Sequence, residues 1–132
     1  GLYVMKLLLD THTALWLFNQ HEYLSANVKA LLLDENNSLH ISIASVWEVA
    51  IKNSLGKLSD FRGGVQAFLS AIQRSHIELV PILAKHIQII ENLPFIHRDP
   101  FDRVLIATAQ SNTMTILTAD ANIQKYDVKW QW

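Results

Sequence analysis

The chain has 132 residues, 50% of them hydrophobic, and a formal net charge of −1 when its six histidines are neutral. This length suits one compact domain, which we expect to span residues 5–132. The absence of cysteine excludes disulfides and thiolate metal sites. No apolar run approaches the roughly 18 residues that a membrane span needs, so we expect a cytoplasmic protein. Residues 1–4 precede Met5 and are expected to be a cloning remnant or an upstream extension.

Short apolar runs alternate along the chain with amphipathic stretches, and these patterns predict strands and helices respectively. The apolar runs predict strands at residues 6–10, 39–42, 77–80, 115–118 and 128–130. The stretches between them predict helices at residues 13–18, 25–33, 45–55, 65–75, 83–92 and 99–112, and a last helical turn at 120–125. Strands that alternate with helices predict an α/β fold in which helices cover both faces of a parallel sheet.

Four acids fall where such a sheet would end its strands or start its helices. They are Asp10 at the end of the first apolar run, Glu48 in the third predicted helix, Asp102 near the start of the sixth, and Asp120 after the fourth strand. Ligands of open α/β sheets bind beyond the carboxyl ends of the strands, so these side chains are expected to converge. Because clustered carboxylates repel one another, such a pocket is expected to hold a hard divalent cation.

Each acid also has an ordinary structural explanation. Asp10 and Asp120 could each cap the helix that follows. Glu48 stands three residues after Ser45, the spacing of a capping box, and four residues before Lys52, the spacing of a helical ion pair. It is less expected that all four acids have separate structural roles than that any one of them does. Their joint pattern therefore favours a shared site.

Asp99 and Asp102 open the same predicted helix but lead to different expectations. Asp99 precedes Pro100, the pattern of an N-cap followed by proline, so we expect it to cap the helix or to support the neighbouring acids. Asp102 would gain from the helix dipole in the first turn. Leu105 and Ile106 follow it at the spacing of one helical face, which places Asp102 beside the buried stripe.

The nearly balanced net charge does not by itself indicate a protein that binds nucleic acid. Acids that hold a metal ion are neutralised by it, however, and basic residues stand close to the four acids in sequence. Lys52, Arg98 and Arg103 are therefore expected to contact phosphates around the site, although each could be ordinary surface charge.

Hydroxyl and imidazole groups also flank the acids. Thr11 and Thr118 could hold a ligand or a water molecule, or could be ordinary turn and strand residues. His12 and His97 could contact a phosphate. We do not expect either imidazole to coordinate the ion, because a hard cation such as Mg²⁺ prefers carboxylates and imidazole suits softer metals.

Four segments that contain the acids resemble the PIN domain, and more narrowly the VapC-type toxins of bacterial type II toxin–antitoxin systems. They read Leu-Leu-Leu-Asp-Thr-His at 7–12, Ser-Val-Trp-Glu-Val-Ala-Ile-Lys at 45–52, His-Arg-Asp-Pro-Phe-Asp-Arg-Val-Leu-Ile-Ala-Thr-Ala at 97–109 and Leu-Thr-Ala-Asp at 117–120. The similarity extends from Met5 to Trp132. The Asp-Pro-Phe-Asp-Arg segment is the most specific part of it, and the others occur in the order and spacing of the family.

The resemblance implies a three-layer α/β/α fold with a mostly parallel central sheet. It implies an endoribonuclease that uses Mg²⁺ or Mn²⁺ to hydrolyse RNA phosphodiester bonds, pairs with a cognate antitoxin and forms a homodimer. Asp10, Glu48 and Asp102 match the catalytic, metal-binding acids of the family, with Asp120 as the fourth. Asp99 matches an extra acid that is typical of this branch.

Other functions fit parts of the pattern. A PIN-domain nuclease that is not a toxin would keep the same acids, and an RNA-binding module would keep the fold without requiring all four. A phosphoacceptor receiver domain would have paired acids at the end of the first strand and a late lysine. Here Asp10 stands alone before Thr11, and no lysine closely follows the fourth strand.

Overall fold

The central element of the fold is a five-stranded sheet in which every strand pairing is parallel. The computed structural model describes residues 5–132, and the expectation for residues 1–4 lies outside this range. The strand order is β3-β2-β1-β4-β5. The strands are β1 (Lys6–Leu9), β2 (Ser38–Ser42), β3 (Glu78–Val80), β4 (Thr115–Leu117) and β5 (Trp130–Gln131). The predicted α/β fold with a largely parallel sheet is confirmed.

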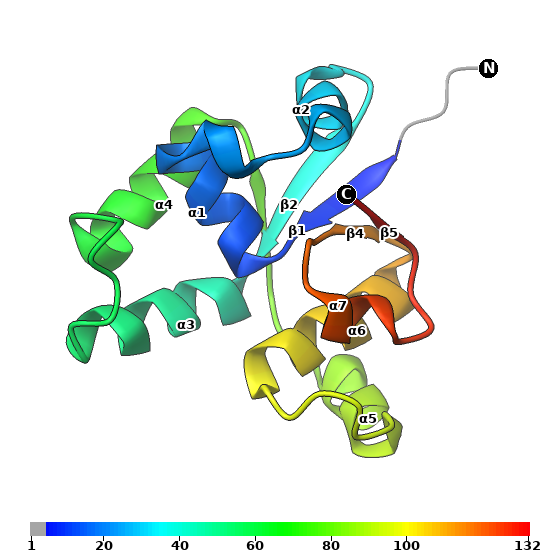
Figure 1. Cartoon of the computed structure of the whole chain (residues 1–132). Helices are drawn as coiled ribbons and strands as arrows, with labels where there is room; N and C mark the ends of the chain where they lie inside the picture. Colours follow the sequence, from blue (N-terminus) through cyan, green and yellow to red (C-terminus); the bar gives the residue numbers. More distant parts are fainter. Residues whose placement is uncertain (1–4) are drawn as a thin grey trace.

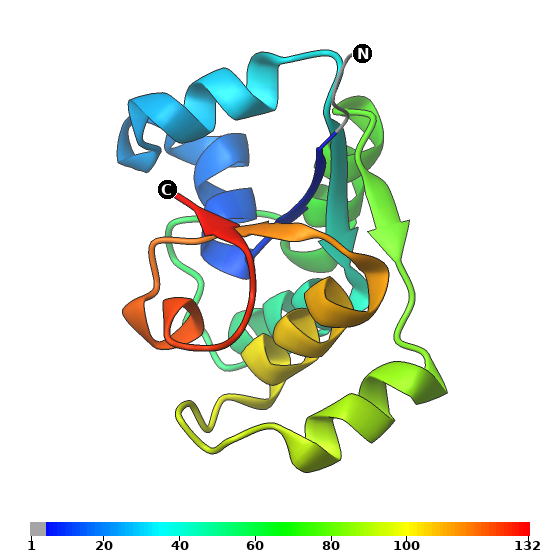
Figure 2. The same cartoon turned by 90° about the vertical axis from the view of Figure 1, so that its right-hand side faces the viewer.

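Helices cover both faces of the sheet and give the molecule three layers (Figures 1 and 2). One face carries α1 (Thr11–Asn19), α2 (Ala26–Leu33) and α4 (Gly64–Arg74). The other carries α5 (Ala84–Asn92), α6 (Pro100–Asn112) and the short α7 (Ala121–Gln124). Helix α3 (Ile43–Ser54) continues from the carboxyl end of β2 and contacts both α4 and α6, and a 3-10 turn, η1 (His21–Tyr23), follows α1. None of the described helices is both long and apolar enough to cross a membrane.

The two faces of β1 contribute to two separate hydrophobic cores. Leu7 and Leu9 pack in the core that includes Phe68 of α4. Leu8 points to the opposite face and packs in the core that includes Leu105 of α6. All three leucines of the strand are fully buried, because helices cover both faces of the sheet. This two-sided burial explains why the run is apolar throughout instead of alternating with polar residues.

The direction of the strand order reverses between β1 and β4. From β1 the chain builds outward through β2 and β3, whereas β4 pairs with the other edge of β1. Leu9 is in register with Leu117, and the N–H of Asp10 donates to the Leu117 carbonyl at 3.2 Å. Asp10 and Asp120 therefore leave the sheet at the same edge. In open α/β sheets this switch point is where ligands bind.

Helix α3 begins earlier than the sequence suggests. Strand β2 runs directly into it, and the Ser42 hydroxyl accepts the N–H of Ala44 at 3.0 Å as the N-cap. Ser45, expected to be the cap, lies within the helix and is fully buried. The predicted capping box between Ser45 and Glu48 is therefore wrong. The Glu48 carboxylate is left to interact with other side chains.

Candidate metal centre

A pocket of about 130 Å³ lies at the switch point of the sheet, and all four predicted acids line it. Its walls come from the end of β1 and the start of α1, from α3, from the first turn of α6 with the loop before it, and from the residue that precedes α7. The lining residues are Asp10, Thr11, His12, Glu48, Lys52, His97, Asp99, Asp102 and Asp120. The convergence that the sheet topology leads one to expect is thus present, and we call this cavity the acidic pocket.

Asp10 is the buried acid at the end of β1, and one of its oxygens has a structural role. Its Oδ1 accepts the N–H of Thr13 at 2.8 Å, which caps α1. Burial raises the pKa of this carboxyl above its ordinary value, and hydrogen bonds from Thr118 and Thr13 oppose the rise. Asp10 therefore caps a helix and also places a carboxylate in the lining of the acidic pocket, where burial disfavours its charged form.

Glu48 is fixed by two side chains that hold its two oxygens. The Thr11 hydroxyl donates to Oε1 at 2.6 Å, and the Lys52 ammonium lies 2.6 Å from Oε2. Thr11 is also hydrogen bonded to the buried Ser45 hydroxyl at 2.9 Å. The ion pair predicted from the spacing of Glu48 and Lys52 is present. It partly neutralises Glu48, a carboxylate whose side chain is only 5% exposed.

Asp102 lies in the first turn of α6, and its carboxyl, like that of Asp10, has a pKa raised well above its ordinary value. Burial raises the pKa of Asp102 to about 7, and the negative charge of Asp99 adds to the rise. Smaller upward contributions come from Glu48 and Asp10, whereas a hydrogen bond with His97 acts in the opposite direction. The Asp102 carboxylate is thus crowded by other acids and poorly hydrated. A cation in the pocket would favour its charged form.

Asp99 and Asp120 both cap helices. Asp99 Oδ1 accepts the N–H groups of Phe101 and Asp102 at 2.8 and 3.1 Å, which caps α6. Asp120 Oδ1 accepts the N–H of Asn122 at 2.8 Å, which caps α7. The N–H of Asp120 in turn donates to the Thr118 hydroxyl at 3.0 Å. The capping bond of Asp120 uses Oδ1 and leaves Oδ2 to face the acidic pocket.

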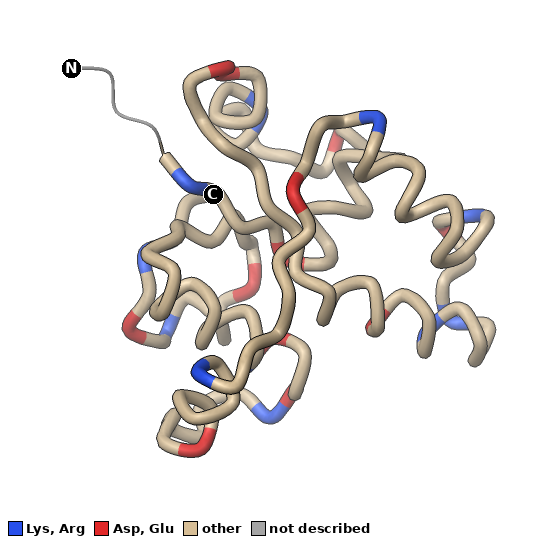
Figure 3. The backbone as a smooth tube through the Cα atoms, turned by 180° about the vertical axis from the view of Figure 1, so that it is seen from behind, with Lys and Arg blue, Asp and Glu red and all other residues tan. Residues whose placement is uncertain are grey.

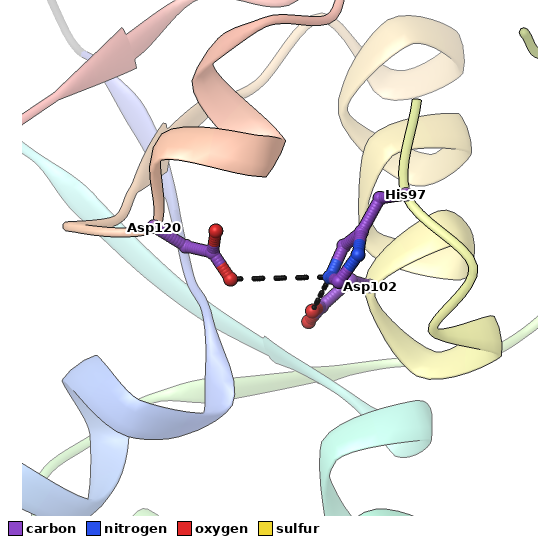
Figure 4. Close-up of side chains that lie close together, drawn as sticks. All are labelled: His97, Asp102 and Asp120. Atoms are coloured by element: carbon purple, nitrogen blue, oxygen red, sulfur yellow. Dashed lines mark hydrogen bonds and ion pairs between the residues drawn. The ribbon is translucent and has the colours of Figure 1, made fainter. Parts of the chain in front are cut away.

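His97 brings an imidazole nitrogen into the group formed by Asp102 and Asp120 (Figure 4). Its Nε2 lies 2.7 Å from Asp102 Oδ2 and 3.9 Å from Asp120 Oδ2. One potential ligand atom from each of the three residues lies within 4.8 Å of the others. From the sequence we expected His97 to contact at most a phosphate. The spacing along the chain gives no signal for this contact, because His97 lies in the loop that precedes α6.

The predicted phosphate contact of Arg103 conflicts with its position. Arg103 is only 5% exposed, and its guanidinium points into the protein. It donates to the backbone carbonyl of Ile90 in the last turn of α5 and to those of Leu93, Pro94 and His97 in the α5–α6 connection. It also lies 3.1 Å from the Tyr126 hydroxyl. Among residues 5–132, no carboxylate forms a salt bridge with it. Its role is to hold the loop that carries His97.

The other two predicted phosphate contacts differ in their placement. Lys52 lines the acidic pocket, whereas Arg98 is exposed and is not among the lining residues. Figure 3 shows the Lys and Arg positions dispersed over the outer turns rather than gathered on one face. Of the basic rim expected from the sequence, the structure thus brings Lys52 to the pocket wall.

The donor atoms of the acidic pocket suit a hard divalent cation. Its acids present carboxylate oxygens, the ligands that Mg²⁺ and Mn²⁺ prefer in proteins. Burial raises the pKa values of both Asp10 and Asp102, so a bound cation would offset charges that the protein itself stabilises poorly. The imidazole of His97 is a softer ligand than the oxygens around it. The carboxylates of the acidic pocket therefore suit, in the type of donor atom, the ion that the sequence pattern predicts. The ligand atoms that lie within 4.8 Å of one another belong to His97, Asp102 and Asp120, whereas Asp10 and Glu48 line the same pocket outside this group.

The fold and the site define an α/β domain with a parallel sheet and a carboxylate pocket at its switch point. The PIN domain family model matches residues 7–129, so the chain belongs to the PIN domain family. This match covers nearly the whole chain and confirms the resemblance found in the sequence. A search of curated protein sequences finds no match.

Several solved structures share this fold at low sequence identity. A chain of VapBC2 from Rickettsia felis, bound to a promoter DNA fragment, superposes with a TM-score of 0.71 at 19% identity, over 96% of this chain and 98% of that one. A chain of DNA-bound VapBC from Salmonella typhimurium superposes with a TM-score of 0.66 at 14% identity, over 97% of this chain and 98% of that one. A chain of VapBC-1 from nontypeable Haemophilus influenzae superposes with a TM-score of 0.56 at 18% identity, over 96% of this chain and 97% of that one. At these identities the likeness concerns the fold.

Proposed function

We propose that this chain is a metal-dependent endoribonuclease that hydrolyses RNA phosphodiester bonds, and that it is the toxin of a type II toxin–antitoxin system. The observation that carries the proposal is the convergence of Asp10, Glu48, Asp102 and Asp120 on one pocket. Membership of the PIN family supports nuclease chemistry. The VapBC structures that share the fold support the toxin role and a cognate antitoxin as partner. We further propose a cytoplasmic homodimer.

In this reaction the protein would hold its carboxylates in place around one or two Mg²⁺ or Mn²⁺ ions. Such an ion lowers the pKa of a coordinated water and neutralises charge on the phosphate. Asp10 and Asp120 each use Oδ1 as a helix cap, so the remaining oxygen is oriented without further cost. Asp102 is held at the start of α6, and Glu48 is fixed by Thr11. No protein nucleophile is required.

Lys52 is the basic side chain best placed to bind the substrate. Its ammonium is held 2.6 Å from Glu48 Oε2, and its side chain is 36% exposed at the wall of the acidic pocket. An ammonium fixed in this way can bind a phosphate oxygen next to the scissile bond. The Thr11 hydroxyl keeps Glu48 in the orientation that holds Lys52 there.

The test is incubation of the purified protein with end-labelled single-stranded RNA in Mg²⁺, in Mn²⁺ and in EDTA. Cleavage is expected with either metal and not in EDTA. Asp102→Asn should lower the rate by at least about a hundredfold, since even residues that only support metal ligands cost 10–100-fold. Lys29→Ala, an exposed change that lies outside the acidic pocket, is the matched control. Cleavage that persists in EDTA contradicts the proposal, and RNA binding without cleavage favours a binding module.

The toxin role has its own test. Expression of the wild type in bacteria is expected to stop growth, whereas Asp102→Asn is expected to be tolerated. Co-expression of the cognate antitoxin should restore growth of the wild type. Sequencing of the RNA ends that appear only with the wild type identifies the substrate. A nuclease that cleaves RNA in vitro but does not affect growth is a PIN nuclease of another kind.

A further inference from the structure

A second pocket adjoins the acidic pocket and shares two residues with it. This cavity, of about 200 Å³, lies between α1, α3 and the α3–α4 connection. Its lining includes His12 and Lys52, which also line the acidic pocket, together with Trp16, Gln20, Lys57 and Asp60. A ligand that spans both cavities would therefore pass directly from one to the other. We call this second cavity the side pocket.

Two aromatic rings, those of His12 and Trp16, line the side pocket, and Trp16 packs against further aromatic side chains. The ring of Trp16 lies 5.8 Å from that of His12, with an angle of 32° between their planes. Trp16 also packs against Tyr23 at 5.6 Å and against Trp132 at 5.7 Å. These contacts limit the movement of the partly buried indole. A fixed aromatic face is what proteins use to stack an unpaired nucleobase.

Two lysines line the same cavity. Lys52 is held by Glu48 at the border with the acidic pocket. The turn that ends α3 brings the backbone of Lys57 back toward Lys52. In this turn Gly56 takes the left-handed conformation, with φ of 67°. The N–H of Lys57 then donates to the Lys52 carbonyl at 2.9 Å. The glycine that terminates the helix thereby places a second ammonium group at the side pocket.

The polar groups of the side pocket suit a base better than a phosphate. Asp60 and Gln20 both line it, and a carboxylate repels a phosphate but accepts hydrogen bonds from the N–H groups of a base. The apolar side chains of Leu15, Leu58 and Phe61 and the polar Ser59 complete the lining. The ligand that fits this combination is a nucleotide with its base against Trp16 and its phosphates at the two lysines.

We propose that the side pocket binds a nucleotide of single-stranded RNA that flanks the phosphodiester held in the acidic pocket. This inference rests on the proposed ribonuclease function and adds a subsite to it. Single-stranded RNA is favoured because a base must leave its helical stack before it can lie on an indole. The subsite selects an unpaired nucleotide at one side of the cut.

The test compares variants in binding of a short fluorescein-labelled single-stranded RNA by EDTA-treated protein, so that cleavage does not interfere. Lys57→Ala should weaken binding and reduce the slope of log K against log salt by about 1, the loss of one phosphate contact. Trp16→Leu should weaken binding about five- to a hundredfold, and Trp16→Phe, which keeps an aromatic face, should lose less. Lys29→Ala, on exposed α2 surface, should bind as the wild type does.

A photo-crosslink locates the base directly. RNA that carries 5-iodouridine should crosslink to the α1 peptide that contains Trp16 in the wild type, and digestion followed by mass spectrometry identifies it. Because Trp16 packs with other aromatic residues, Lys57→Ala keeps the test valid if Trp16→Leu fails to fold.

The outcomes separate this inference from the proposed function. Wild-type cleavage of RNA together with unchanged binding by Lys57→Ala and Trp16→Leu, and no crosslink in α1, overturns the side-pocket inference alone. A wild type that neither binds nor cleaves RNA overturns both. Variants that lose a protein partner but keep their RNA affinity identify the side pocket as a protein-docking site, which also overturns the inference.

Discussion

The imidazole Nε2 of His97 lies 2.7 Å from Oδ2 of Asp102, which joins the α5–α6 connection to the first turn of α6. The carboxyl in this contact is the one whose pKa burial raises to about 7. Asp102 also belongs, with His97 and Asp120, to the group of residues whose ligand atoms are close enough to hold a metal ion. An ion that binds Oδ2 of Asp102 therefore competes with the imidazole for it.

The first prediction concerns the stability of the metal-free protein against pH. Between its ordinary pKa of 3.8 and about 7, Asp102 keeps a proton in the folded state that the unfolded chain has lost. This group therefore stabilises the fold at low pH, and the contribution disappears as the pH rises through 7. Asp102→Asn never ionises, so it should stabilise the metal-free protein more at about pH 8 than at about pH 5. Urea unfolding in EDTA measures the difference, and an equal effect at both pH values contradicts the prediction.

The second prediction separates the two roles of Asp10. Asp10→Asn keeps an oxygen that can cap the N–H of Thr13 and removes a buried charge, whereas Asp10→Ala removes both. Asparagine should therefore give the more stable metal-free protein by about 1 kcal/mol, the usual contribution of a helix cap. Both variants should lose the rise in melting temperature that Mn²⁺ gives the wild type. Equal stability of the two variants would mean that the cap contributes nothing.

The convergence of the acids follows from features that the sequence displays. Apolar runs identify the strands, parallel pairing brings their carboxyl ends to one edge, and Asp10 and Asp120 follow two of those ends. Their second role as helix caps is also expected from residue type. One periodic pattern and one topological rule thus account for the position of the acidic pocket.

Arg103 and His97 could not be placed in this way, because their positions depend on a loop. Apart from the Tyr126 hydroxyl, the hydrogen-bond acceptors around Arg103 are backbone carbonyls, which are present at every residue and so leave no trace in the sequence. Helical periodicity treats arginine as a surface residue unless an acid is available to pair with it. The position of His97 depends in turn on the loop that Arg103 holds. The site was therefore predicted where side chains follow regular elements and missed where loop conformation decides.

The third prediction is that Arg103 stabilises the fold and positions His97. Arg103→Met leaves several carbonyls of the α5–α6 connection without a donor and should lower the free energy of unfolding by about 2–4 kcal/mol. Arg103→Lys keeps the charge but cannot reproduce the planar fork, so it should restore only part of the loss. The NMR signals of the His97 ring should move toward those of a free histidine in both variants.

The control for this third prediction is the neighbouring Arg98. Its side chain is exposed, so Arg98→Lys should change the unfolding free energy by no more than about 0.5 kcal/mol and leave the His97 signals in place. Unchanged His97 signals in Arg103→Lys and Arg103→Met would show that Arg103 stabilises the loop without positioning the imidazole.

The fourth prediction concerns His40, a buried residue of β2 outside the acidic pocket. Burial lowers the pKa of His40, and the charge of Glu78 opposes this effect only in part. Among residues 5–132 its buried Nδ1 has no hydrogen-bond partner, and the exposed Glu78 carboxylate lies 3.9 Å from it. Below its ordinary pKa of 6.5 the unfolded chain binds a proton more readily than the folded protein, so the fold loses stability as the pH falls.

His40→Gln should weaken this acid destabilisation, whereas His21→Gln, at an exposed position, should not. Denaturant midpoints from about pH 7.5 to 5 measure the effect, and parallel curves for the wild type and His40→Gln would rule out His40 as its source.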